Sequence, residues 1–133
     1  MFDTVAFTAG AWAVRMDVMT MKATLDAASE VPPNDSKGAG QGTFDYDTAT
    51  RLLQWHITYN GLTGRATAGH VHGPATVGAN AGVAIPIPFA ASPIDGSATL
   101  TRAQGAWLKA GRLYVNVHTA ANPDGEIRGQ IVR

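Results

Sequence analysis

Apolar and polar residues alternate one by one along several short stretches of the chain, a period typical of β-strands with one buried face. In the segment 52–59, for example, Trp55 and Ile57 flank His56. Successive side chains of a strand point to opposite faces, so the apolar set is expected to face a core and His56 the opposite side. Strands are predicted at 22–28, 38–45, 52–59, 65–72, 83–89, 94–100, 112–118 and 126–132.

Turn-forming residues separate these strands, with breaks at 31–35, 47–50, 73–82 and 121–125. Pro86 and Pro88 confine the strand at 83–89 to the edge of a sheet, because proline has no N–H to donate to a neighbouring strand. Many short strands at regular spacing favour an antiparallel β-sandwich or barrel with Greek-key-like connections.

One short helix is predicted at 101–110. Thr101 and Gln104 match a capping box, and Gly111 is a natural helix stop. The predicted fold class is therefore all-β with a single short helix.

The chain of 133 residues has the length of one domain. It contains no cysteine, which excludes disulfides and thiolate metal ligands within it, and its formal net charge is zero. Nucleic-acid binding requires a concentrated positive field, so no nucleic-acid partner is expected. No stretch approaches the roughly 20 apolar residues of a membrane-spanning helix, so no membrane span is expected either.

Residues 1–20 differ in character from the rest and are interpreted as an N-terminal extension of a domain at 21–133. The first fifteen residues are mildly apolar, yet they carry Asp3 where a signal peptide carries positive charge. Exposed apolar side chains such as Phe2 and Trp12 are costly in water. We therefore expect the extension to pack on the domain, on a protein partner or on a second copy of the chain.

Four histidines lie in predicted strands or at their ends: His56, His70, His72 and His118. His70 and His72 are two residues apart, so they share a strand face at about 6.5–7 Å. Two imidazoles at that spacing can converge on one ion, and a third from another strand would complete a site that suits copper, zinc or nickel. Alternatively, the histidines brace the loop 73–82 through hydrogen bonds to its carbonyls.

Other polar residues near the C-terminus have simpler interpretations. Asn122, Asp124 and Glu126 are expected to form a hairpin turn, since the EF-hand pattern of a calcium loop is absent. Glu126 and Arg128 share a face and are expected to form a surface ion pair worth under ~1 kcal/mol. Asn116 and Glu126 are candidates to hold the outer ring nitrogens of metal-binding histidines.

Three ordered motifs resemble those of the CHRD (chordin-domain) family. Residues 23–33 resemble its opening strand and Pro-Pro turn. Residues 62–64 and 68–75 match its central Leu-Thr-Gly and His-x-His-Gly-Pro-Ala signature, and residues 113–119 and 122–130 match its terminal signature. The resemblance covers about residues 21–133.

The resemblance implies a small binding module that is exported to the periplasm or secreted. Chordin itself antagonises growth factors, but this chain lacks the cysteine-rich modules that flank the domain there, so that role is not carried over. The family signature contains His70, His72 and His118 together, whereas His56 is not a signature position.

Three functional hypotheses follow. The first is a module that binds one copper or zinc ion through His70, His72 and His118, with His56 as a possible fourth ligand. The second is a metalloenzyme with redox chemistry, because the histidine pattern is similar to that of copper/zinc superoxide dismutase. The third is a structural or adhesive module without a metal. We rank the enzyme below binding, since the sequence offers no convincing second group for catalysis.

Overall fold

The structure is a computed structural model that describes residues 17–133. The expected packing of residues 1–15 therefore concerns a segment outside the described residues. The described part contains eight strands and one helix, in the order β1 (Val18–Asp26), β2 (Ala39–Asp47), β3 (Leu52–Asn60), β4 (Ala66–His72), β5 (Val83–Ile87), β6 (Ile94–Thr99), α1 (Arg102–Lys109), β7 (Tyr114–Thr119) and β8 (Ile127–Gln130).

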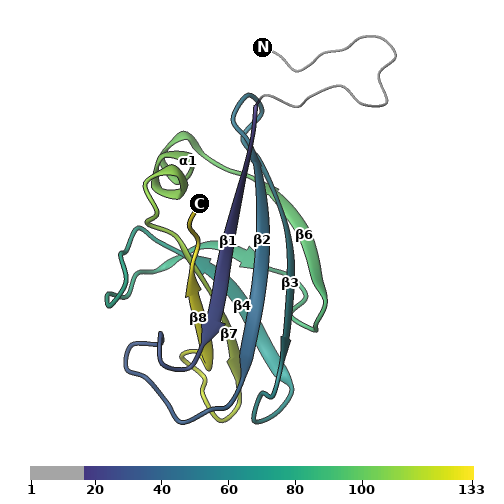
Figure 1. Ribbon diagram of the computed structural model, residues 1–133, viewed down its shortest axis with the longest axis vertical. Helices are drawn as coiled ribbons and strands as arrows, with labels where there is room; N and C mark the ends of the chain where they lie inside the picture. Colours follow the sequence, from purple (N-terminus) through teal and green to yellow (C-terminus); the bar gives the residue numbers. More distant parts are fainter. Residues whose placement is uncertain (1–16) are drawn as a thin grey trace.

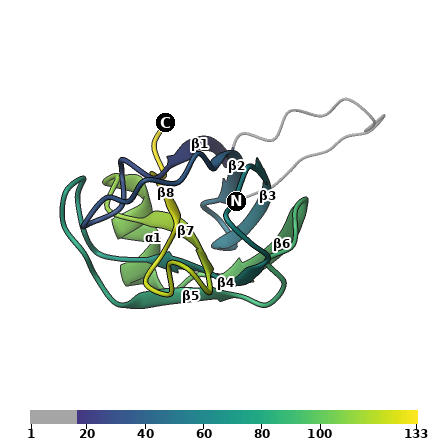
Figure 2. The same cartoon turned by 90° about the horizontal axis from the view of Figure 1, so that it is seen from below.

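All eight strands belong to one sheet, in the order β5-β4-β7-β8-β1-β2-β3-β6. Every pairing between these strands is antiparallel. The sheet curls into a nearly closed barrel, as the two views along different axes show (Figure 1, Figure 2). The prediction of an antiparallel β fold with one short helix is confirmed.

The barrel interior is filled by the apolar face of each strand. In β3 the alternation is complete, with Leu53, Trp55 and Ile57 buried and the intervening residues exposed. Burying a large apolar side chain stabilises the fold by roughly 1.5–3 kcal/mol, so this repeated pattern sets the strand register. The other buried apolar residues of the barrel include Met21, Leu25, Phe44, Val71, Ile85, Ile87, Ile94, Val115, Val117 and Ile127.

Helix α1 begins and ends as the sequence predicts. Thr101 accepts a hydrogen bond from the Gln104 backbone N–H at 3.1 Å, and the Gln104 side chain accepts one from the Thr101 N–H at 2.9 Å. Gly111 follows the helix with φ +73°, a conformation that favours glycine. No helix within residues 17–133 is long and apolar enough to cross a membrane.

Strand boundaries differ modestly from the prediction. β5 lies at one edge of the sheet, as expected from Pro86 and Pro88, and it ends at Ile87. β1 begins at Val18, four residues before the predicted strand, and pairs with β2 from that residue onward.

The expected surface ion pair between Glu126 and Arg128 is wrong. Both side chains are fully buried, with 0% and 1% of their surface exposed, and they do not contact each other as an ion pair. The physical reason is that loops 27–38 and 73–82 cover this part of the sheet, and Asn80 of one loop donates to the Val31 carbonyl of the other at 2.8 Å. All six residues of β7 are consequently buried, and strand alternation no longer separates core from solvent there.

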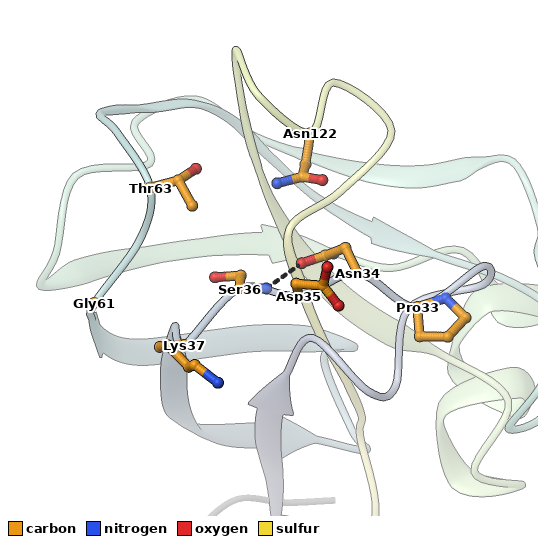
Figure 3. A pocket seen from close by; sticks show the side chains of 8 residues that line it. All are labelled: Pro33, Asn34, Asp35, Ser36, Lys37, Gly61, Thr63 and Asn122. Carbon is orange, nitrogen blue, oxygen red and sulfur yellow. Dashed lines mark hydrogen bonds between the residues drawn. The ribbon is translucent and has the colours of Figure 1, made fainter.

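Glu126 instead joins three loops. Its carboxylate accepts hydrogen bonds from Ser36 Oγ, Thr63 N, Thr63 Oγ1, Thr119 Oγ1 and Asn122 Nδ2. Ser36, Thr63 and Asn122 also line an open polar pocket of about 520 Å³, which Figure 3 shows between these loops. Burial alone would raise the pKa of Glu126, but the hydrogen bonds from Ser36, Thr119 and Thr63 outweigh it and lower the pKa to about 2.

The Glu126→Gln variant should be less stable than the wild type at neutral pH by about 3 kcal/mol, the equivalent of the lowered pKa. A carboxyl with a depressed pKa stabilises the fold above its unfolded-state pKa of about 4.5, and that stabilisation is lost as the pH falls towards 2. Urea unfolding at several pH values measures this difference. The difference in unfolding free energy should shrink between pH 4.5 and 2. The exposed control Asp45→Asn should show the same pH dependence of stability as the wild type. A constant difference would contradict this role for Glu126.

Candidate metal centre

Three of the four histidines converge on the outer face of β4 and β7. His70 and His72 lie on the same face of β4, as their spacing predicts, with the buried core residue Val71 between them. In the β4–β7 register His118 pairs with Ala68, two residues from His70. One ligand nitrogen from each of the three rings lies within 4.8 Å of the others.

The closest pair is His70 and His118. The Nδ1 atom of His70 lies 3.0 Å from Nε2 of His118, and the ring centroids are 4.7 Å apart. The His72 ring centroid lies 5.4 Å from that of His70 and 6.1 Å from that of His118. A modest rearrangement of these side chains would bring the three nitrogens to bonding distance of one ion.

Two of the rings are oriented by backbone carbonyls. The Nδ1–H of His72 donates to the Ala81 carbonyl at 3.0 Å, and the Nδ1–H of His118 donates to the Pro123 carbonyl at 2.9 Å. In a neutral imidazole this leaves Nε2 with its lone pair. His118 Nε2 then accepts from His70 Nδ1, so the metal-free cluster is held together by a hydrogen bond between two ligands.

The two residues predicted to hold outer ring nitrogens of the histidines behave differently from one another. Asn116 does lie at the site, but its Oδ1 faces Nε2 of His72 at 3.0 Å, the nitrogen available to a metal. Glu126 does not hold a histidine, because its carboxylate is occupied by the three loops described above.

Sequence reasoning missed Tyr114. Its ring stacks on the His72 ring with centroids 4.9 Å apart and planes within 7°, and its hydroxyl accepts from Ala81 N and can donate to Ala81 O. The guanidinium of Arg128 lies 3.5 Å from the Tyr114 ring centroid. The available signal was its spacing, since Tyr114, Asn116 and His118 alternate along β7 and share a face.

The three histidines differ in their exposure to solvent. His72 and His118 are buried, while His70 is partly exposed. Burial lowers the pKa of His70 and of His72. The hydrogen bonds of His72 to Ala81 and Asn116 oppose this lowering, and the neighbouring His118 lowers the pKa of both histidines further. Because neutral imidazole is the form that binds metals, these shifts keep His70 and His72 competent below the ordinary imidazole range.

His56 does not join this group. It lies on β3, where its Nδ1 contacts Asp95 Oδ1 of β6 at 2.6 Å, and 58% of its side chain is exposed. Among the described residues, the group with metal-binding geometry therefore contains His70, His72 and His118 alone.

Glu30 is a buried acid behind the site. It is 5% exposed, and its Oε2 has no hydrogen bond of ordinary geometry. Burial raises its pKa to about 7, against the opposing effects of the Arg128 charge and a hydrogen bond from Asn116. Asn116 thus lies between a histidine and a buried carboxyl group.

Comparison with known families gives one match, to the CHRD domain, and it covers residues 21–131. No curated protein and no solved structure matches the chain. The matched range contains all three converging histidines.

The pH dependence of folding stability should distinguish the buried His72 from the buried Glu30. A histidine with a lowered pKa stabilises the fold above its unfolded-state pKa near 6.5, and this is lost as the pH falls. A carboxyl with a raised pKa does the reverse: its stabilisation is present below about 4.5 and is lost as the pH rises towards 7. From pH 6.5 to 5, metal-free His72→Gln should therefore gain stability relative to the wild type.

Glu30→Gln should lose stability relative to the wild type over the same pH interval. Chemical unfolding of each variant, with chelator present, measures both trends, and His56→Gln serves as an exposed histidine control. Parallel curves for all four proteins would show that neither buried group titrates differently in the folded state.

Proposed function

The chain belongs to the CHRD domain family, and we propose that it is a binding module that captures one copper or zinc ion through His70, His72 and His118. The observation that carries the proposal is the arrangement of the three rings. Their nitrogens lie within 4.8 Å of one another, and two of them already have the opposite ring nitrogen held by a carbonyl. This is how proteins orient imidazole ligands.

The choice of copper or zinc follows from the donor atoms. Neutral imidazole suits zinc and copper, whereas magnesium and calcium require oxygen ligands. The chain has no cysteine, so thiolate cannot contribute from within it. Three protein nitrogens leave a further coordination position, which the partly exposed side of His70 makes accessible.

Loop bracing is a second candidate role, favoured by the same hydrogen bonds. His72 ties β4 to loop 73–82, and His118 ties β7 to the turn at Pro123. In this alternative the histidines stabilise the loops and bind no metal. A redox enzyme is ranked below both, because the Tyr114 hydroxyl is engaged with Ala81 and Asn116 carries no titratable proton.

CHRD domains are generally extracellular modules. We extend the proposal to this chain and infer that it acts in the periplasm or after secretion. A metal site made only of histidine is compatible with an oxidising compartment, since imidazole is not oxidised to a disulfide as a pair of cysteines is.

Copper(II) or zinc should raise the melting temperature of the protein. At a free metal concentration of 100 times Kd, binding to the folded state alone stabilises it by about 2.7 kcal/mol. His72→Ala and His118→Ala should lose this shift, and His56→Ala should keep it. Calorimetric titration and thermal unfolding of protein purified without a histidine tag measure affinity and shift.

The loop-bracing role predicts a different pattern. His72→Ala and His118→Ala would then lower the melting temperature of the metal-free protein, while neither metal would change that of the wild type. A metal-induced shift that survives in His72→Ala would also contradict the proposed site.

A further inference from the structure

Asn116 occupies an unusual place for an amide side chain. It lies in the middle of β7, is only 3% exposed, and directs Oδ1 at Nε2 of His72 over 3.0 Å. The His72 ring is already committed on its other side, where Nδ1–H donates to the Ala81 carbonyl. The ring of His72 therefore lies between two oxygen acceptors.

A neutral imidazole carries a single N–H, so it can donate to only one of these two oxygen acceptors. With its proton on Nδ1, His72 presents a lone pair at Nε2, and Asn116 Oδ1 presents lone pairs to the same region. Two such atoms at 3.0 Å repel each other unless a proton on Nε2 makes the contact a hydrogen bond or a metal ion lies beside both. Protonation of both ring nitrogens would leave a charge on a ring that is 9% exposed, whereas a metal ion bonded to Nε2 and Oδ1 would satisfy both atoms with the ring neutral.

The amide orientation has an independent support in Glu30. Nδ2 of Asn116 and Oε2 of Glu30 lie next to each other beside Gly125, so the N–H side of the amide faces that carboxyl group. Gly125 packs against both, because a Cβ atom at this position would collide with Glu30 Oε2 and Asn116 Nδ2. With Nδ2 directed to Glu30, Oδ1 is left to face His72.

Two of the distances between donor atoms also fit a shared ion. Two donors bonded at about 2.0–2.1 Å, with an angle of 90–110° between the bonds, lie about 2.9–3.4 Å apart. Both close pairs in the site meet this condition, since His70 Nδ1 and His118 Nε2 are 3.0 Å apart, as are His72 Nε2 and Asn116 Oδ1.

We propose that Asn116 Oδ1 is a fourth protein ligand of the metal, giving a site of three imidazole nitrogens and one amide oxygen. This inference rests on the proposed function. A fourth ligand of this kind also narrows the choice of metal ion, because an oxygen atom is a hard donor and disfavours Cu(I). The site should therefore prefer Cu(II) or Zn(II) to Cu(I).

The test compares Asn116→Ala and Asn116→Asp with the wild type and with Asn60→Ala, which removes an exposed amide on β3 far along the sheet. The probes are Cu²⁺, followed by electron paramagnetic resonance, and Zn²⁺, followed by competition titration. Asn116→Ala should weaken Zn²⁺ binding at least tenfold and alter the Cu²⁺ hyperfine splitting. Asn116→Asp should bind both ions at least as tightly as the wild type, with a shifted Cu²⁺ spectrum. Asn60→Ala should match the wild type.

A wild-type affinity and an unchanged Cu²⁺ spectrum in Asn116→Ala would overturn the assignment, and Asn116 would then only orient His72. If Asn116→Ala does not fold, the nearly isosteric Asn116→Asp decides, and an unchanged spectrum there overturns the assignment as well. Loss of binding in His72→Ala with no change in either Asn116 variant refutes the fourth ligand alone. Failure of the wild type to bind either ion refutes the proposed function, and the fourth ligand with it.

Discussion

Polar side chains on the outer face of β4, β7 and β8 are buried beneath loops 27–38 and 73–82, and this burial constrains the rest of the structure. A buried polar group left without a partner costs about 1–3 kcal/mol. Arg128 accordingly donates to Asn80 Oδ1 and the Thr76 carbonyl, and Gln130 donates to the carbonyls of Ala75 and Gly111. These hydrogen bonds tie loop 73–82 to the polar residues of β8.

The buried histidines are also paired with loop atoms, but their hydrogen bonds have a second chemical effect. Each hydrogen bond from a ring N–H to a loop carbonyl satisfies a buried group and also fixes which nitrogen keeps a lone pair. The same side-chain geometry therefore suits both loop bracing and metal binding. The bond that orients His72 on loop 73–82 is also the bond that would prepare its Nε2 for an ion.

Local pattern was sufficient for much of this structure. Alternation in β3, the capping box at Thr101 and Gln104, and the shared face of His70 and His72 depend on neighbours in the sequence, so the sequence predicts them. The convergence of the three histidines is expected from the motifs and the strand face, with His118 beside His72. The register instead places His118 against Ala68 and His70, which local pattern does not reveal.

Long-range burial was not predictable in this way. The hairpin containing Glu126 was interpreted as solvent-exposed, because nothing local to it reveals that Ser36 and Thr63 will pack on it from 90 and 63 residues away. For the same reason the sequence does not predict a role for Tyr114, and it predicts Asn116 behind a histidine, where the structure places its Oδ1 at Nε2 of His72. The proposed use of His56 depends on a proximity that the strand order does not provide.

The metal-free cluster also fixes where the ring protons lie, since His70 carries its proton on Nδ1, facing His118. An ion bound at that atom would displace the proton, and the partly exposed ring can accept it at Nε2 instead. Neutral imidazoles would then bind the ion with no net proton release, and the lowered pKa values of His70 and His72 extend that behaviour to more acidic solution.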